Sequence, residues 1–141
     1  MTSTALTRFQ LLEEAPGATT IRRVKHATVV EIVGDVTLYS SRHVRNAILV
    51  ALDDLAVPQV IVDFSRVKYL DSSGIASLVE CLLYSRKAGR RLSLCGLQTG
   101  PRQVLELTRL VNLFEVFDDV EMALSILPLG PRLCSTARYT E

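Results

Sequence analysis

The sequence predicts one α/β domain with a mixed, mostly parallel central sheet of about four to five strands and about four helices. Strand-like and helical segments alternate along the chain, and the apolar run Val60–Phe64 is typical of a strand covered on both faces. A chain of 141 residues has the usual length of a single domain. We expect this domain to span residues 21–127, between a flexible arm (1–20) and a mobile tail (128–141).

The charge balance argues against a polyanionic partner. Sixteen Lys and Arg residues face fifteen Asp and Glu residues, which leaves a formal net charge of +1. Because nucleic acid and anionic membrane surfaces are bound mainly through clustered positive charge, we expect no direct nucleic-acid binding. No stretch approaches the ~20 apolar residues of a membrane helix, so membrane insertion is not expected either.

Cysteine usage and the amino-terminal residues point to a reducing compartment. Cys81, Cys95 and Cys134 are odd in number, widely spaced and without a CxxC pair, which disfavours disulfides and a zinc site. The segment Met1–Leu6 lacks the basic start and apolar run of a signal peptide. We therefore expect a cytoplasmic protein without a metal or other cofactor.

The first strands are predicted from β-branched residues. The pattern becomes strand-like at Ile21, and residues 27–33 form an apolar, β-branched run that Gly34-Asp35 ends. The segment Arg22–His26 is interpreted as the other half of a hairpin with this run.

Two helices flank the apolar strand 60–64. Ser40-Ser41 provides a capping residue for the first helix, and Pro58 closes that unit. The apolar stripe of this helix is Val44, Ala47, Ile48, Ala51, Leu52 and Leu55. The second helix is predicted over Ser73–Ala88, because Gly89 is a typical residue after a helix end.

The last third of the chain continues the alternation. After a strand at 91–96, a helix begins at Gly100-Pro101 and is expected to stop near Asn112, a residue that tolerates a left-handed conformation. Leu113–Phe117 alternates as a short strand. Asp118-Asp119 then caps a final helix.

The stretch Asp71-Ser72-Ser73-Gly74 stands where the strand 60–64 gives way to a helix with Ile75, Leu78 and Leu82 on one side. A helix N-terminus has unpaired N–H groups and the positive end of the helix dipole, which favour a side-chain oxygen or a phosphate. From these residues alone, the serines are interpreted either as helix caps or as a regulatory switch.

With its flanking elements, this stretch resembles STAS domains and, among them, the bacterial anti-sigma factor antagonists. The resemblance covers roughly Val29 to Leu127. It rests on a strand ending in Gly34-Asp35, on Val60–Phe64 leading into Asp71–Gly74, and on a Gly-Pro-led helix that closes with Leu113-Phe114. A DSSG tetrapeptide alone recurs by chance, whereas DSSG between this strand and this helix is specific.

The resemblance implies that Ser72 is a phosphoacceptor, with Asp71 as its acidic neighbour and Gly74 as the residue that lets a partner approach closely. The first loop departs from the family pattern, because Thr37 stands where an acid is common. The residues expected to contact the partner are Asp35, Thr37, Tyr39, Asp71, Ser72, Ser73, Gly74 and Ile75.

The implied partner is an anti-sigma factor with serine-kinase activity that binds the ATP itself. The unmodified protein would sequester this partner and free a sigma factor, and phosphorylation of Ser72 would release the partner. The chain itself is then a non-enzymatic interaction module, and homo-oligomerisation is left open.

The alternative function is that of a constitutive adaptor. A constitutive STAS adaptor of a lipid-transport ATPase or of a stress-sensing scaffold would use the same face without phosphate on Ser72. A receiver domain phosphorylated on Asp63 is rejected, since the acidic pair and the lysine that receivers need are missing. His26 and His43 have no metal-ligand spacing, and no hydrolase motif accompanies Ser72.

Overall fold

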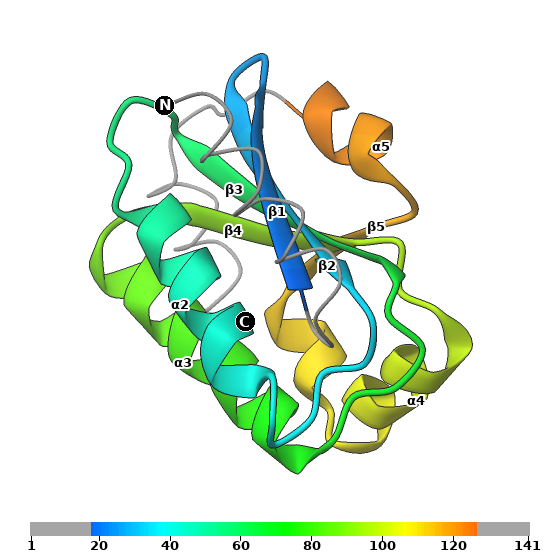
Figure 1. Ribbon diagram of the computed structural model, residues 1–141. Coiled ribbons are helices and arrows are strands. Elements are labelled where there is room, and N and C mark those ends of the chain that lie inside the picture. Colours follow the sequence, from blue (N-terminus) through cyan, green and yellow to red (C-terminus); the bar gives the residue numbers. More distant parts are fainter. Residues whose placement is uncertain (1–17, 127–141) are drawn as a thin grey trace, which may run out of the picture.

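A five-stranded sheet forms the centre of residues 18–126, the part of the chain that the computed structural model describes (Figure 1). The strands lie in the order of the sequence: β1 (Ala18–Val24), β2 (Ala27–Val33), β3 (Gln59–Arg66), β4 (Arg91–Cys95) and β5 (Glu115–Phe117). β1 is antiparallel to β2, and all other neighbours are parallel. The predicted fold class, mixed and mostly parallel, is confirmed.

The helices between and after these strands are α2 (Ser41–Leu52), α3 (Ser72–Lys87), α4 (Thr99–Leu107), the 3-10 helix η1 (Leu110–Leu113) and α5 (Val120–Ser125). α2 and α3 lie side by side on one face of the sheet, and α5 lies on the other (Figure 1). None of the helices within residues 18–126 is long and apolar enough to cross a bilayer.

The hairpin of β1 and β2 is confirmed, and it begins earlier than predicted. The pairing runs from Ala18 opposite Val33 to Val24 opposite Ala27. The turn between them holds Lys25 in a left-handed conformation, with a φ of 54°. β1 thus starts at Ala18 and not at Ile21, because its register is set by pairing with β2, which the local sequence does not show.

β3 is buried on both faces, as its apolar run predicts. Successive side chains of a strand point to opposite sides of the sheet. Val60 and Val62 belong to the main core with α2 and α3, whereas Ile61 packs in a smaller cluster with Ala123 of α5. The strand is therefore central, with its carboxyl end fixed relative to the helices on both sides.

The end of α4 differs from the sequence prediction. The helix predicted to reach Asn112 ends at Leu107, and the left-handed residue is Arg109, with a φ of 63°. The hydroxyl of Thr108 donates to the carbonyls of Val104 and Leu105, and this side-chain bond competes with further helix. The predicted cap of the last helix is confirmed, since Asp119 accepts from the N–H of Met122 at 2.8 Å.

Leu55 does not belong to the buried stripe of α2, contrary to the prediction. It continues the helical spacing of the stripe on α2, but α2 ends at Leu52, and the side chain of Leu55 is 82% exposed. The other members of the predicted stripe face the sheet: Val44, Ile48, Ala51 and Leu52 are buried, and Ala47 packs against the same core.

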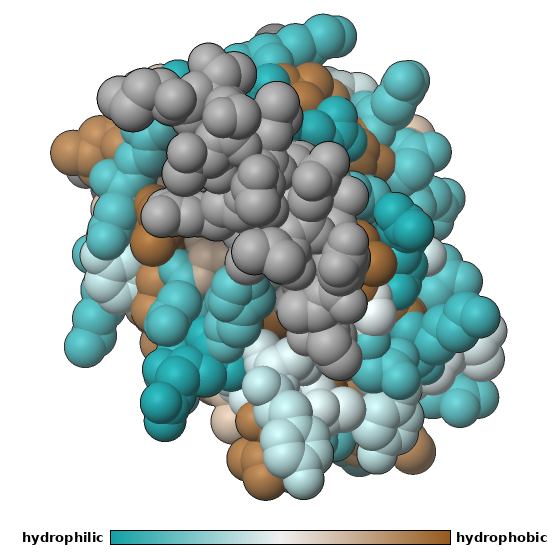
Figure 2. All heavy atoms as spheres, in the orientation of Figure 1, coloured by the Kyte–Doolittle hydropathy of each residue, from teal (hydrophilic) through white to brown (hydrophobic). Residues whose placement is uncertain are grey.

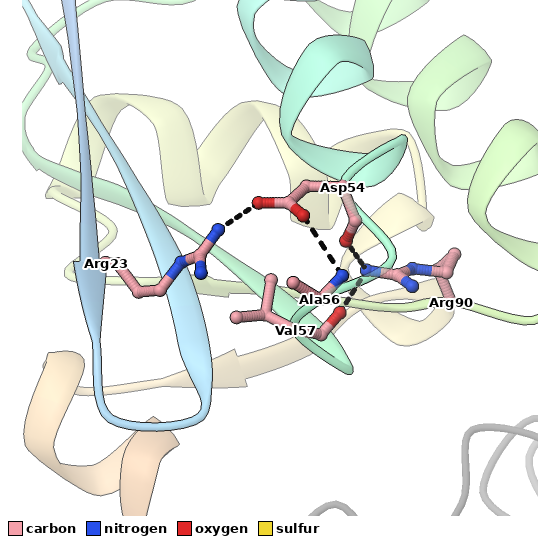
Figure 3. A network of polar contacts seen from close by, with 5 residues as sticks. All are labelled: Arg23, Asp54, Ala56, Val57 and Arg90. Atoms are coloured by element: carbon pink, nitrogen blue, oxygen red, sulfur yellow. Dashed lines mark hydrogen bonds and ion pairs between the residues drawn. The ribbon is translucent and has the colours of Figure 1, made fainter.

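A buried arginine fastens the loop after α2 to the start of β4 (Figure 3). The Arg90 guanidinium donates to the carbonyl oxygens of Asp54, at 2.6 Å, and of Val57. The Asp54 carboxylate in turn accepts from the Ala56 N–H at 3.0 Å and pairs with Arg23 of β1. Arg90 thus satisfies two backbone carbonyls of the loop between α2 and β3 that no secondary structure pairs.

We predict that Arg90→Met lowers the free energy of unfolding by about 2 kcal/mol, because two backbone carbonyls lose a charged donor. Urea unfolding followed by circular dichroism measures the change. Arg42→Met, at an exposed position of α2, is the matched control and should change stability little. Equal stabilities of the two variants would contradict this role.

Candidate functional site

The loops that follow β2 and β3 meet at one edge of the sheet. β2 and β3 are parallel, so their carboxyl ends lie together. Beyond the strands, a short parallel bridge joins Val36 to Leu70. The N–H of Val36 donates to the carbonyl of Tyr69 at 3.0 Å, and the N–H of Asp71 donates to the carbonyl of Val36 at 3.1 Å. Segments that lie far apart in the sequence therefore form one continuous surface.

Asp71 is the residue that organises this surface. It is the N-cap of α3, and its Oδ1 accepts from the N–H of Gly74 at 3.0 Å and from the hydroxyl of Ser73 at 2.6 Å. Its Oδ2 accepts from the N–H of Leu38 at 3.0 Å. One carboxylate thus caps the helix and holds the loop after β2.

The same contacts favour the ionised carboxylate. The hydrogen bond from Ser73 contributes most to holding the pKa of Asp71 below its ordinary value of 3.8. The N–H groups of Gly74 and Leu38 also lower the pKa, whereas desolvation opposes them. Asp71 is therefore negatively charged at neutral pH.

The structure distinguishes the two adjacent serines. Ser72 is the first residue of α3 and is exposed, and its hydroxyl bonds to none of the residues 18–126. Ser73 is half-buried, and its hydroxyl donates to Asp71. Ser72 therefore presents the accessible hydroxyl of the pair, whereas that of Ser73 serves the cap.

Ser40 holds the loop after β2 from within. It occupies the predicted N-cap position of α2, but its side chain does not cap the helix. Its buried hydroxyl instead donates to the carbonyl of Asp35 and accepts from the N–H of Thr37, both at 3.0 Å. The hydroxyl of Thr37 accepts from the N–H of Tyr39 at 3.3 Å. The sequence indicates only a helix cap at Ser40. In the folded loop its hydroxyl bonds to nearby backbone groups instead, and the local sequence does not show these partners.

Large apolar side chains project from this ordered edge. Tyr39 is 93% exposed and Leu38 is 71% exposed, while Tyr69, which follows β3, is 54% exposed. Asp35 is exposed as well, so the predicted residues Asp35, Tyr39 and Ser72 are all accessible from solvent.

Gly74 and Ile75 pack against other residues of this chain. A Cβ at Gly74 would lie 2.5 Å from Leu70 Cδ1 and 2.9 Å from Val36 Cγ1. The close packing at this glycine is therefore made by the chain's own two loops. Ile75 is half-buried and packs against the main core.

Cys81, Cys95 and Asp63 are buried side chains. Within residues 18–126, no group of three or more His, Cys, Asp or Glu side chains is arranged to hold a metal ion. Burial raises the pKa of Cys81 and of Cys95 to about 12, so both thiols are protonated at neutral pH. Asp63 is buried at the end of β3 and accepts from the N–H of Ser65 at 2.9 Å.

Comparison with known families identifies the fold. The model of the STAS domain matches residues 18–123, which is most of the chain. The chain belongs to the STAS domain family. The match includes both loops of the edge described above and the whole of α3.

Solved STAS-like structures share this fold at low sequence identity. An anti-sigma factor antagonist from Mycobacterium paratuberculosis is 23% identical with a TM-score of 0.68, covering 79% of this chain and 95% of that one. The Bacillus cell fate determinant SpoIIAA, in its phosphorylated form, is 21% identical with a TM-score of 0.61, covering 77% and 97%. A sulfate transporter family protein from Wolinella succinogenes is 21% identical with a TM-score of 0.65, covering 74% and 87%. At these identities the similarity concerns the fold.

We predict that Gly74→Ala destabilises the STAS domain by about 1–3 kcal/mol, because the added methyl group overpacks the contact with Val36 and Leu70. The gain in helix propensity, about 1 kcal/mol, does not offset this strain. Urea unfolding measures the change. Ala76→Gly, at an exposed position of α3, is the control and measures the effect of helix propensity alone. A Gly74→Ala variant that is more stable than the parent would contradict overpacking at this position.

Asp71→Asn should lower stability by about 1 kcal/mol at neutral pH, since asparagine caps a helix well but offers one acceptor oxygen where two are used. Because the folded-state pKa of Asp71 is depressed, the contribution of its charge is complete above the ordinary value of 3.8 and is lost as the pH falls through the lower, folded-state value. Urea midpoints of both proteins across this range should converge at acid pH. A difference in urea midpoint between the two proteins that stays constant with pH would contradict a stabilising role of the Asp71 charge.

Proposed function

We propose that this STAS domain is an anti-sigma factor antagonist that acts by partner switching, with Ser72 as its phosphoacceptor. The unmodified protein binds an anti-sigma factor with serine-kinase activity, and phosphorylation releases that partner. The observation that carries the proposal is the exposed Ser72 hydroxyl, which bonds to none of the residues 18–126, beside a Ser73 hydroxyl that is engaged by Asp71.

The position of Ser72 suits a phosphate within this fold. A phosphoserine carries about −1.5 to −2 charges at neutral pH. At the first residue of α3, the helix dipole and the N–H groups of the first turn favour this negative charge. The domain would therefore remain folded when it is modified.

The same phosphate would be unfavourable in a tight interface. A partner that covers Ser72 would have to bury a charge without a counter-ion, which costs several kcal/mol. The neighbouring Leu38, Tyr39 and Tyr69 are suitable contacts, because exposed aromatic and apolar side chains often contribute most to binding energy. Binding and phosphorylation would thus exclude each other at one surface.

In this proposal the chemistry belongs to the partner. The kinase binds ATP and transfers the phosphoryl group, while this chain supplies the acceptor hydroxyl and no catalytic residue. The STAS domain acts as a cofactor-free interaction module that regulates transcription through the sigma factor that its partner holds.

A second candidate is a constitutive adaptor that binds through the same edge without phosphate. Thr37 stands where the family commonly has an acid, and its hydroxyl is used inside the loop to accept from Tyr39. The fold is also similar to that of a sulfate transporter family protein, which indicates that this scaffold serves other assemblies. These observations keep a lipid-transport ATPase or a stress-sensing scaffold as the alternative partner.

Phosphopeptide mapping of the native protein tests the choice. The protein is purified from its own cells during growth and under stress, and the co-purifying proteins are identified. We expect phosphate on Ser72 that changes with conditions, together with a serine kinase. An unphosphorylated Ser72 in every condition, with an ATPase or a large scaffold bound, would refute the switch and support the adaptor.

The substitutions Ser72→Ala and Ser72→Glu should separate binding from release. Ser72→Ala should keep partner affinity and accept no phosphate, whereas Ser72→Glu should weaken the complex about tenfold or more, equivalent to about 1.4 kcal/mol. Isothermal titration calorimetry with the purified partner measures the affinities of both variants. Ser73→Ala should still be phosphorylated at Ser72, and phosphate that requires Ser73 would assign the wrong hydroxyl.

A further inference from the structure

We propose that phosphate on Ser72 is transmitted to the loop carrying Leu38 and Tyr39 through the carboxylate of Asp71, which releases the N–H of Leu38. This inference rests on the proposed function, and it assigns Asp71 as a positioning residue of the same surface. The switch then has two effects: the phosphate opposes the partner directly, and it loosens a loop that the partner contacts.

The loop depends on Asp71 through a single side-chain bond. Asp71 Oδ2 accepts from the N–H of Leu38 at 3.0 Å, across 33 positions of the sequence. The other bonds near the tip of this loop are made within it, by Thr37 and Ser40. Behind the tip, backbone bonds join Val36 to Tyr69 and Asp71. The segment from Leu38 to Tyr39 is therefore held at its base by the backbone and toward α3 by one carboxylate.

A phosphate on Ser72 would compete with Asp71 in two ways. The residues are adjacent at the same helix end, so about −1.5 to −2 added charges come close to a carboxylate that is already ionised. The phosphate oxygens are also strong acceptors for N–H groups of the first helical turn, where Gly74 now donates to Asp71. Both effects push the carboxylate out of its present orientation, and the bond to Leu38 is lost with it.

Loss of the hydrogen bond between Asp71 and Leu38 affects the segment that carries the exposed side chains of Leu38 and Tyr39. Leu38 and Tyr39 are 71% and 93% exposed, yet their backbone is ordered by hydrogen bonds. Exposed apolar side chains on an ordered backbone bind with little entropy cost, and that advantage disappears when the backbone loosens. Phosphate on Ser72 would therefore weaken even those partner contacts that lie beside it.

Hydrogen exchange of individual amides tests this coupling. The full chain is prepared with serine or with phosphoserine at position 72, and exchange is followed by NMR. We expect the Leu38 amide to exchange about tenfold faster in the phosphorylated protein, which corresponds to about 1.4 kcal/mol. The amides of Val36 and Asp71 are internal controls, because they donate to backbone carbonyls and should keep their rates.

Asp71→Asn is the variant that isolates the carboxylate. Asparagine retains one acceptor for the helix cap but no second oxygen for Leu38. In this variant the Leu38 amide should exchange fast without phosphate, and phosphorylation should accelerate it no further. Dispersed NMR spectra confirm that the variant is folded, and a general loosening would instead also speed exchange of the control amides.

The coupling and the proposed function fail in different ways. If the phosphorylated protein releases its partner while the Leu38 amide exchanges at an unchanged rate, the coupling is overturned and the switch stands. Equal acceleration by phosphate in wild type and in Asp71→Asn would also overturn the role of Asp71. If phosphate accelerates exchange of the Leu38 amide in wild type but not in Asp71→Asn, the coupling is supported, whether or not an anti-sigma factor is the partner.

Discussion

The parallel pairing of β2 with β3 places the carboxyl ends of two strands at one edge of the sheet, and the surface around Ser72 depends on this placement. Beyond the strands, the bridge between Val36 and Leu70 continues the pairing into the loops. Gly74 allows α3 to start directly behind this bridge, because no side chain stands between them. The edge is therefore built by backbone pairing and close packing, which leave its outward side chains available to a partner.

Asp71 adds an electrostatic element to this framework. A side chain that only capped α3 would need one acceptor oxygen, yet both oxygens of Asp71 are used and the second reaches Leu38. A carboxylate adjacent to the proposed phosphoacceptor is well placed to respond to new negative charge. In the proposed switch, stability of the helix and readout of the phosphate thus depend on the same group.

The buried network around Arg90 lies at the other ends of the strands and helices (Figure 3). It fastens the loop after α2 to the start of β4, while the proposed interaction surface lies at the carboxyl ends of β2 and β3. Hydrophilic and hydrophobic residues are interspersed among the coloured residues of the face seen in Figure 2. The exposed side chains of the proposed interaction surface include Ser72, Leu38 and Tyr39.

The sequence by itself determined the α/β class, the hairpin, the central position of β3 and the start of α3 at the Asp-Ser-Ser-Gly stretch. These features follow from local periodicity, capping and turn residues. Only the tertiary structure decided which serine hydroxyl is accessible, that Gly74 faces Val36 and Leu70, and that Ser40 braces the loop. Each of these outcomes depends on which distant segment lies opposite a residue, and that is settled by strand register and packing, which the local pattern of side chains does not encode.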